Sequence, residues 1–249
     1  MMETNSLKVC FKTEDNINIV GILNLPKSCP HPPVLILAHG FCADKNENGL
    51  FVLAAQEFSK HGYAVLRFDF RGCGESEGEF KNVRLEDKIC DMQAAIDFIK
   101  SCDENLNKNS IGFVGFSLGA TVGLLSNIFN AANMKAISFW APAFFPDKDM
   151  YPRYKCQSIE DELNKYGYFK KANLKVSKQF INDLAHCNTE RHLRKFKKPV
   201  FIVHGSNDQR ISLKSSEVGF SYIISTDKWI DKIDGASHSF KESIEYRKK

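Results

Sequence analysis

The sequence predicts an α/β fold in which a mostly parallel sheet carries helices on both faces. Short apolar, β-branched segments alternate with longer amphipathic segments along most of the 249 residues, a pattern typical of strands joined by helical crossovers. Hydrophobic residues make up 43% of the chain and charged residues 26%, which is ordinary globular composition. A chain of this length can bury a large core. We therefore expect a single domain over residues 1–249.

Eight strands are expected, and from Val34 onward each buried strand is followed by a helical pattern. The first two strands can pair as an antiparallel hairpin. The strands are expected near 7–12, 17–25, 34–38, 64–69, 110–115, 136–141, 199–204 and 228–233. The helices are expected at 49–61, 86–102, 118–131, 178–187, 212–220 and 239–247.

One connection interrupts the alternation after the sixth strand. The chain from Ala141 to Pro199 is far longer than the roughly two to six residues usual within an α/β unit. Its first part is rich in aromatic residues, so we expect a small cap at about 142–195 that lines an apolar substrate pocket. The candidate substrate contacts are Phe144, Phe145, Tyr166 and Tyr168. Alternatively, these aromatic side chains only pack the cap onto the sheet.

The segment Gly115-Phe116-Ser117-Leu118-Gly119 stands between an apolar strand and a helix-forming run. A nucleophile elbow needs this order of strand, sharp turn and helix, with small residues two before and two after the serine. The pattern alone is weak, and its flanks make it specific. Ser117 is therefore the predicted nucleophile.

A serine hydroxyl needs a general base, and the base needs a group that fixes its tautomer. His238 follows a turn just past the last strand, and Asp208 follows the strand before it, at the carboxyl edge where catalytic loops gather. The order Ser117, Asp208, His238 is the order of such triads on this kind of sheet. Asp234 and Asp231 are weaker candidates for the acid. His204, at a strand end, is predicted to be structural.

The oxyanion of acyl transfer needs backbone N–H donors. Leu118, directly after the nucleophile, supplies one, and the loop after the third strand supplies the second. Within that loop Phe41 is the candidate donor, Gly40 allows close approach of the backbone, and His39 is suited to brace the loop. The alternative is a simple turn at the end of a strand.

These residues resemble the α/β-hydrolase superfamily, and more narrowly the bacterial cinnamoyl (feruloyl) esterases and their serine aminopeptidase-like (S33-type) relatives. The resemblance rests on His39-Gly40-Phe41, on the segment 68–80 with its D-x-R-G-x-G-x-S pattern at 69–76, and on the elbow at 115–119. It implies an α/β-hydrolase fold and the same roles for Ser117, Asp208, His238, Phe41 and Leu118. Residues 144–195 do not match the cinnamoyl esterase insertion.

The predicted function is a serine carboxylic ester hydrolase that works through an acyl-enzyme on small aryl or acyl esters, with no metal and no organic cofactor. A monoacylglycerol lipase, an acyl thioesterase and a small peptidase keep the same triad and change the substrate. A non-catalytic ligand-binding protein of this fold is a different class, and its mark would be an incomplete triad.

The charge balance, hydropathy and cysteine pattern argue against a nucleic-acid-binding protein, a membrane protein and a secreted protein. The net charge of +4, from 34 basic and 30 acidic residues, is too small for a nucleic-acid or anionic-membrane footprint, and the basic run at 191–198 is interpreted as a solvated helix face. No apolar run reaches the roughly 18 residues of a membrane span. Eight scattered cysteines without a C-x-x-C pair and an N-terminus without a secretory signal favour a cytoplasmic setting. The expected partner is a small ester, and a homodimer is left open.

Overall fold

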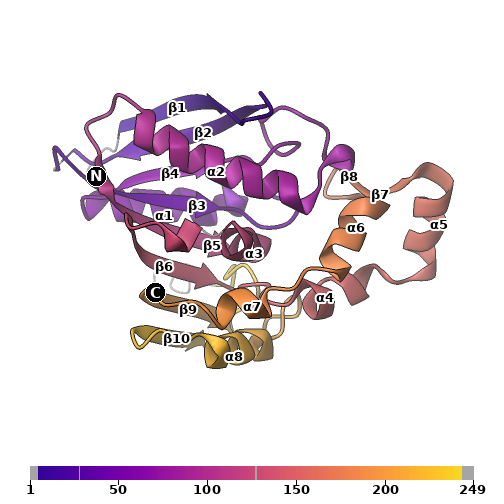
Figure 1. Cartoon of the computed structure of the whole chain (residues 1–249). Coiled ribbons are helices and arrows are strands. Elements are labelled where there is room, and N and C mark those ends of the chain that lie inside the picture. Colours follow the sequence, from indigo (N-terminus) through magenta and orange to yellow (C-terminus); the bar gives the residue numbers. More distant parts are fainter. Residues whose placement is uncertain (1–4, 28, 127, 243–249) are drawn as a thin grey trace.

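An eight-stranded sheet forms the centre of the computed structural model, which describes residues 5–27, 29–126 and 128–242 (Figure 1). The strands follow one another in the order β1-β2-β4-β3-β5-β6-β9-β10. β2 is antiparallel to both of its neighbours, β1 and β4, and the pairings from β4 to β10 are parallel. All eight predicted strands are confirmed. Their bounds are β1 Asn5–Lys12, β2 Asn18–Leu25, β3 Pro33–Ala38, β4 Ala64–Phe68, β5 Asn107–Phe116, β6 Met134–Trp140, β9 Val200–Gly205 and β10 Lys228–Ile233.

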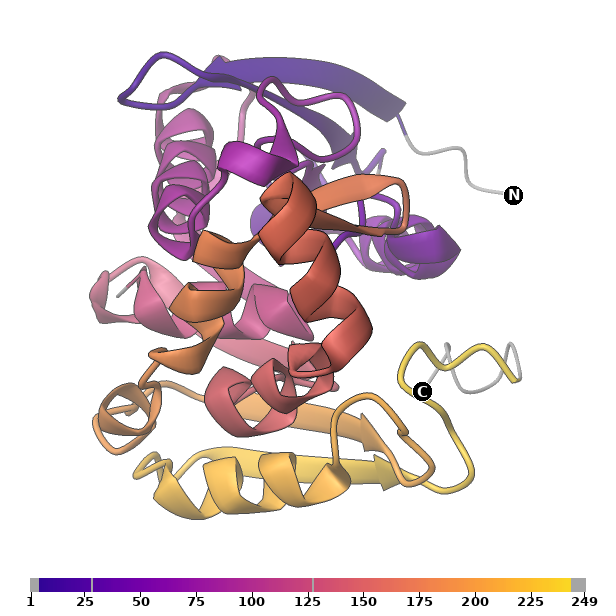
Figure 2. The ribbon, with the colours of Figure 1, turned by 90° about the vertical axis from the view of Figure 1, so that its right-hand side faces the viewer.

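Helices lie on both faces of the sheet, with α2 and α3 on one face and α1 on the other (Figures 1 and 2). Their bounds are α1 Leu50–Lys60, α2 Leu85–Ser101, α3 Leu118–Leu125 and α8 Leu213–Tyr222, with short 3-10 turns η1 Glu47–Gly49, η2 Phe80–Asn82 and η3 Ile128–Asn130. No helix of the described ranges has the length and hydropathy needed to cross a membrane.

Two predicted helices differ from the structure. The helix expected at 118–131 ends at Leu125, because Ser126 Oγ donates to the carbonyl of Gly123 and Phe129 turns into the core against Phe113. In the helix expected at 239–247, Phe240 has a φ of 53°, which a right-handed helix does not allow, and residues 239–242 are not helical. The remainder of that prediction lies outside the described residues.

The central strands are buried on both faces, as expected of parallel strands beneath helices. Ile36 and Phe113 belong to the apolar cluster on the α2 and α3 side. Their chain neighbours Leu37 and Val114 belong to a second cluster, which contains Phe51 of α1. This double burial fixes the register of β3 and β5 and therefore the positions of the loops at their carboxyl ends.

The connection between β6 and β9 holds several short elements that lie beyond the carboxyl ends of the parallel strands (Figure 2). We call residues 142–195 the cap segment. Arg84, which precedes α2, donates from Nε and Nη2 to the two carboxylate oxygens of Asp183 at 2.8 Å each, and this pair ties α6 to the start of α2. The elements are α4 Pro146–Asp149, η4 Tyr151–Tyr154, α5 Gln157–Tyr166, β7 Tyr168–Lys171, β8 Leu174–Ser177, α6 Lys178–Ala185 and α7 Glu190–Leu193.

Candidate active site

Ser117 occupies a strained turn between β5 and α3. Its φ of 52° and ψ of −117° lie where residues other than glycine are uncommon. The turn is so tight that a Cβ on Gly119 would lie 2.1 Å from the carbonyl oxygen of Ala38, and a Cβ on Gly115 would lie 2.7 Å from the Cα of Ala120. The two glycines therefore allow the elbow, which holds the Ser117 hydroxyl at the carboxyl edge of the sheet.

The structure brings Ser117, His238 and Asp208 together. Ser117 Oγ lies 3.1 Å from His238 Nε2, and His238 Nδ1 lies 2.6 Å from Asp208 Oδ2. A carboxylate only accepts hydrogen bonds, so Nδ1 carries the proton and Nε2 is free to accept the proton of the serine hydroxyl. All three residues are buried. Three groups arranged in this way can act chemically as a nucleophile, a base and an orienting acid.

Asp208 is held as a carboxylate by several donors. Oδ1 accepts from the backbone N–H groups of Arg210 and Ile211, and Oδ2 lies 3.1 Å from His204 Nε2 as well as near His238. Burial raises the pKa of Asp208, but the hydrogen bonds from His204 and His238 outweigh it and hold the pKa well below its ordinary value. Asp208 therefore stays charged at neutral pH.

His204 is the one residue of this group whose contact the sequence did not indicate. Its Nε2 also lies 3.0 Å from the carbonyl oxygen of Ile211, which can only accept, so Nε2 carries the proton, and Ser216 Oγ lies 2.7 Å from Nδ1. His204 therefore has the predicted structural role, and it fulfils it by donating a hydrogen bond to Asp208. The two alternative acids lie elsewhere: Asp231 is exposed on β10, and Asp234 accepts from Ser206 Oγ.

The loop after β3 lies beside the elbow. A Cβ on Gly40 would lie 3.3 Å from the Cβ of Ser117, so the backbone of this loop passes close to Ser117 and brings Phe41 to the rim of the same pocket. His39 braces the loop: its Nε2 accepts from the N–H of Phe70 at 3.1 Å, and its Nδ1 donates to the carbonyl of Gly40 at 2.9 Å. Burial, followed by the charge of Lys88, lowers the pKa of His39 to about 3. It is therefore neutral.

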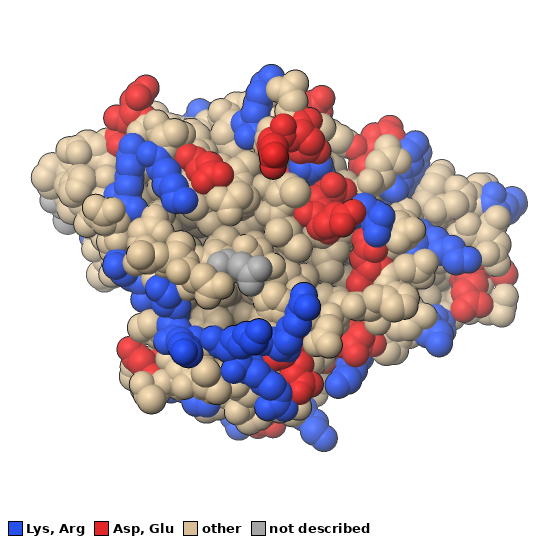
Figure 3. Space-filling model, viewed as in Figure 1, with Lys and Arg blue, Asp and Glu red and all other residues tan. Residues whose placement is uncertain are grey.

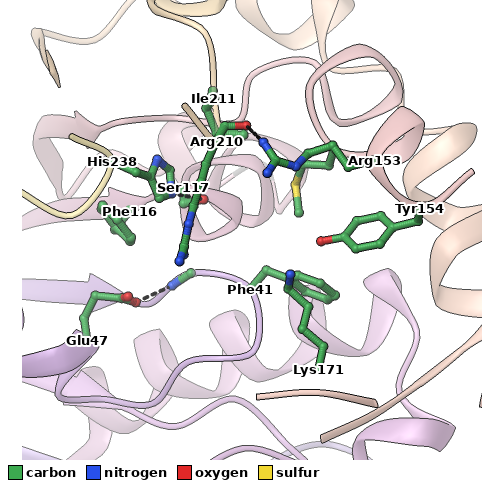
Figure 4. Close-up of a pocket in the computed structure, with 12 residues that line it drawn as sticks. Phe41, Glu47, Phe116, Ser117, Arg153, Tyr154, Lys171, Arg210, Ile211 and His238 are labelled. Carbon is green, nitrogen blue, oxygen red and sulfur yellow. Dashed lines mark hydrogen bonds between the residues drawn. The ribbon is translucent and has the colours of Figure 1, made fainter. Parts of the chain in front are cut away.

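Glu47 fixes the same loop from the other side. Its Oε2 accepts from the N–H of Gly40 at 2.7 Å, which leaves the next N–H along the chain, that of Phe41, outside this bond. The Glu47 side chain is buried and borders the pocket (Figure 4). Sequence reasoning did not find this residue, because no short motif marks a carboxylate that bonds a loop seven residues before it.

A pocket of about 230 Å³ opens beside Ser117 (Figure 4). The sheet side contributes Ser117, His238 and the loop after β3, and the cap segment contributes residues of η4 and the end of β7. The lining residues are Gly40, Phe41, Glu47, Phe116, Ser117, Met150, Arg153, Tyr154, Lys171, Arg210, Ile211 and His238. Within the described ranges no group of three or more His, Cys, Asp and Glu side chains is arranged to hold a metal ion.

The four predicted substrate contacts are not among the residues that line this pocket. Phe144 is fully buried and packs against Phe139, with ring centroids 5.2 Å apart, and Phe145 packs edge-to-face against Tyr222. Tyr166 and Tyr168 lie against each other at the junction of α5 and β7, and Tyr166 is 55% exposed.

The cap aromatics that reach the site belong to a cluster around Phe41. The ring of Phe41 stacks on Phe180 at 5.4 Å and meets Phe80 and Tyr154 edge-on at 5.8 Å each. Tyr154 in turn packs on Phe169 at 5.5 Å. Most of these aromatic side chains pack the cap onto the β3 loop, and Tyr154 also borders the pocket.

Comparison with known proteins shows that the chain matches the model of one family and is distantly similar to several proteins. The profile of the family described as serine aminopeptidase, S33, matches residues 30–177. An uncharacterized 31.7 kDa protein of Escherichia coli, from the traX-finO intergenic region, is 34% identical over 100 residues. That match covers 40% of this chain and 32% of the relative, so the chain spans about a third of that relative's length.

Two further matches extend over most of the chain. The mitochondrial palmitoyl-protein thioesterase ABHD10 of Mus musculus is 23% identical over 219 residues, which is 86% of this chain and 71% of the relative. The solved structure of Est1E from Butyrivibrio proteoclasticus with bound ferulic acid superposes with a TM-score of 0.81 at 22% identity, and the match covers 95% of this chain and 93% of that chain. Together with the strand order, this likeness confirms the predicted α/β-hydrolase fold.

Proposed function

Because the chain belongs to the serine aminopeptidase S33 family of α/β hydrolases, we propose that it is a serine carboxylic ester hydrolase that works through an acyl-enzyme. The observation that carries the proposal is the hydrogen-bonded relay from Ser117 through His238 to Asp208, set at a strained turn beside a pocket. A relay of this kind activates a hydroxyl for attack on a carbonyl carbon.

The reaction follows from the geometry. Ser117 Oγ forms a bond to the ester carbonyl carbon while its proton passes to His238 Nε2, 3.1 Å away. The N–H groups of Phe41 and Leu118 stabilise the oxyanion, and His238 returns the proton to the leaving alcohol as the carbon–oxygen bond breaks. A water molecule then repeats the sequence on the acyl-enzyme, so that the acid leaves and Ser117 regains its proton.

The charge of the pocket argues against an aminopeptidase within this family. A substrate α-ammonium needs a carboxylate to hold it, and the carboxylate of this lining, Glu47, already accepts from the N–H of Gly40. Arg153, Lys171 and Arg210 border the same space and repel a cation. An acyl thioesterase is the second candidate, favoured by the likeness to a palmitoyl-protein thioesterase over 86% of the chain.

Labelling by a fluorophosphonate tests the nucleophile. The wild type is expected to gain one adduct, and peptide mapping should place it on Ser117. In Ser117→Ala the adduct should be lost, and kcat should fall by at least roughly 1,000-fold because the attacking oxygen is removed. Thermal unfolding of both proteins serves as the folding control.

Two outcomes would contradict the proposal. An absent adduct on folded wild type, under conditions that modify a control esterase, rejects the enzyme. Full esterase activity in Ser117→Ala rejects the nucleophile. A panel of p-nitrophenyl esters, methyl ferulate, acyl-CoA and aminoacyl anilides then decides the leaving group, and the proposal expects the oxygen esters to have the highest kcat/KM.

A further inference from the structure

Three cationic side chains border the pocket beside Ser117. Arg210 follows Asp208 by two residues, Arg153 comes from η4 and Lys171 ends β7, so three separate segments bring positive charge to one space (Figure 4). All three side chains are exposed to solvent.

None of the three has a carboxylate within 4.0 Å among the residues that the structure describes. Arg153 donates from Nη1 to the carbonyls of Gln209 and Arg210 at 2.8 and 3.0 Å. These bonds hold its guanidinium beside the loop that carries Asp208. Lys171 Nζ lies 5.4 Å from the ring centre of Tyr154 and 5.9 Å from that of Phe41. No direct ion pair therefore neutralises any of the three within the described residues, although Asp44 and Glu47 lie along the adjoining hollow that Lys171 and Arg210 also line.

The charges act on one another across the pocket. The Lys171 residue is exposed, but neighbouring atoms partly desolvate its amine and lower its pKa; Cys42 opposes this shift, and the charges of Arg210 and Arg153 add to it. Such mutual repulsion is relieved when an anion lies between the cations. Tyr154 adds a hydroxyl that points toward the same space (Figure 4), and hydrogen bonds to an ionised group are stronger than those to a neutral one.

Glu47 offsets the positive charge of the pocket only in part. Its carboxylate accepts from the N–H of Gly40 at 2.7 Å and lies away from Arg153 and Lys171 (Figure 4), while the charge of Arg210 lowers its pKa. Burial raises its pKa to about 7, so at neutral pH the carboxylate carries only part of a charge. The pocket is therefore net positive.

We propose that the pocket selects esters that carry a second, anionic group, a carboxylate held by Lys171, Arg153, Arg210 and the Tyr154 hydroxyl while Ser117 attacks the ester carbonyl. This inference rests on the proposed function and names its substrate class. The carboxylate belongs either to the acyl part or to the leaving alcohol, and the two sources are separated by experiment.

Two matched substrate pairs make the test. Monomethyl adipate and methyl hexanoate differ by a carboxylate on the acyl part, and 3-acetoxybenzoate and phenyl acetate differ by one on the leaving group. In at least one pair, kcat/KM of the anionic member should exceed that of the neutral member by roughly tenfold, the scale of one or two charge-assisted hydrogen bonds.

Variants tie that preference to the pocket. Lys171→Met and Arg153→Gln should each reduce the ratio of anionic to neutral kcat/KM several-fold. Lys170→Met is the matched control: Lys170 is the exposed neighbour on β7, does not border the pocket and projects to the other side of the strand. It should leave the ratio unchanged.

The outcomes separate this inference from the proposed function. Ratios of one or less in both pairs, with Ser117-dependent hydrolysis intact, overturn the anionic substrate and leave the esterase standing. If none of these esters is hydrolysed, a competition experiment replaces them. Fluorophosphonate labels Ser117 in the presence of either 3-carboxyphenylboronic acid or phenylboronic acid, and the protection that each boronic acid gives is compared. Stronger protection by the carboxylated probe, lost in Lys171→Met, supports the anion site, and equal protection overturns it.

Discussion

Glu47, which accepts from the N–H of Gly40 in the loop after β3, should make the stability of the protein depend on pH. It is buried, and burial raises its pKa from an ordinary value of 4.5 to about 7, with the bond from Gly40 N–H opposing the shift. A carboxyl whose pKa is higher in the folded state binds its proton more tightly there than in the unfolded chain. Its contribution to stability is complete below about pH 4.5 and is lost as the pH rises through 7.

Glu47→Gln should remove this dependence, because the amide keeps an acceptor for Gly40 N–H and cannot ionise. Between pH 5 and 8 the free energy of unfolding of the wild type should fall relative to that of the variant by about 2 to 3 kcal/mol. Urea unfolding of both proteins at the two pH values measures the difference. Glu160→Gln, an exposed position on α5, is the control, and an equal fall in Glu47→Gln and wild type would contradict the prediction.

At the scale of elements, burial decides what the sequence could predict. The core strands and the elbow at 115–119 were predictable because apolar periodicity and paired glycines mark them directly. α5 contributes no fully buried residue; its Ile159 and Leu163 pack only partly buried against the core, which is a weaker signal in the sequence. Phe144 was predicted to touch substrate on its aromatic character, but the same character buries it against Phe139.

The sequence predicts the meeting of Ser117, Asp208 and His238 better than it predicts the lining of the pocket. Ser117, Asp208 and His238 follow strand ends, and parallel strands bring their carboxyl ends to one edge, so chain order predicts their meeting. Arg153, Lys171 and Arg210 are exposed cations among many others, and only the fold of η4 and the β7–β8 hairpin brings the first two to Arg210. His204 was predicted to be structural, but its bond to Asp208 depends on the turn at 205–208.

The contact between the start of α3 and the end of β3 should be intolerant of one methyl group. In Gly119→Ala the new Cβ would lie 2.1 Å from the carbonyl oxygen of Ala38 and 2.8 Å from that of His39. Separating the two elements should cost about 2 kcal/mol or more in stability. It should also lower kcat by roughly 100-fold, because the Leu118 and Phe41 amides move apart.

Gly167→Ala is the matched control for that substitution. Gly167 caps α5 with a φ of 74° and has open space around it, so alanine there should cost about 1 kcal/mol from the backbone alone and leave kcat unchanged. Thermal unfolding and ester hydrolysis are measured on both variants. Wild-type kcat in Gly119→Ala would contradict the role assigned to this contact.

At the scale of the whole molecule, positive charge gathers in more than one place. Figure 3 shows Lys and Arg side chains concentrated over the face near α7, where Lys195, Lys197 and Lys198 line a hollow with Phe129. This basic surface, residues 195–198, does not border the pocket of Ser117. The net charge of +4 therefore includes positive charge from separate surfaces. The electrostatic potential at the pocket depends mainly on the cations that border it.

Ionic strength distinguishes these sources of charge. If the cations at the pocket attract an anionic ester, raising NaCl from roughly 10 mM to 1 M, which shortens the Debye length from about 30 Å to about 3 Å, should lower kcat/KM for that ester several-fold. The neutral partner ester should change little, because screening acts on charge alone.

Two variants of equal charge locate the effect. Lys171→Met removes one positive charge at the pocket and should flatten the dependence of log kcat/KM on salt for the anionic ester. Lys197→Met removes one from the basic surface at 195–198, which does not border the pocket, and should flatten the dependence much less, because a more distant charge interacts with the ester more weakly. Equal flattening by both variants would assign the attraction to net charge, and the position of Lys171 would then have no special role.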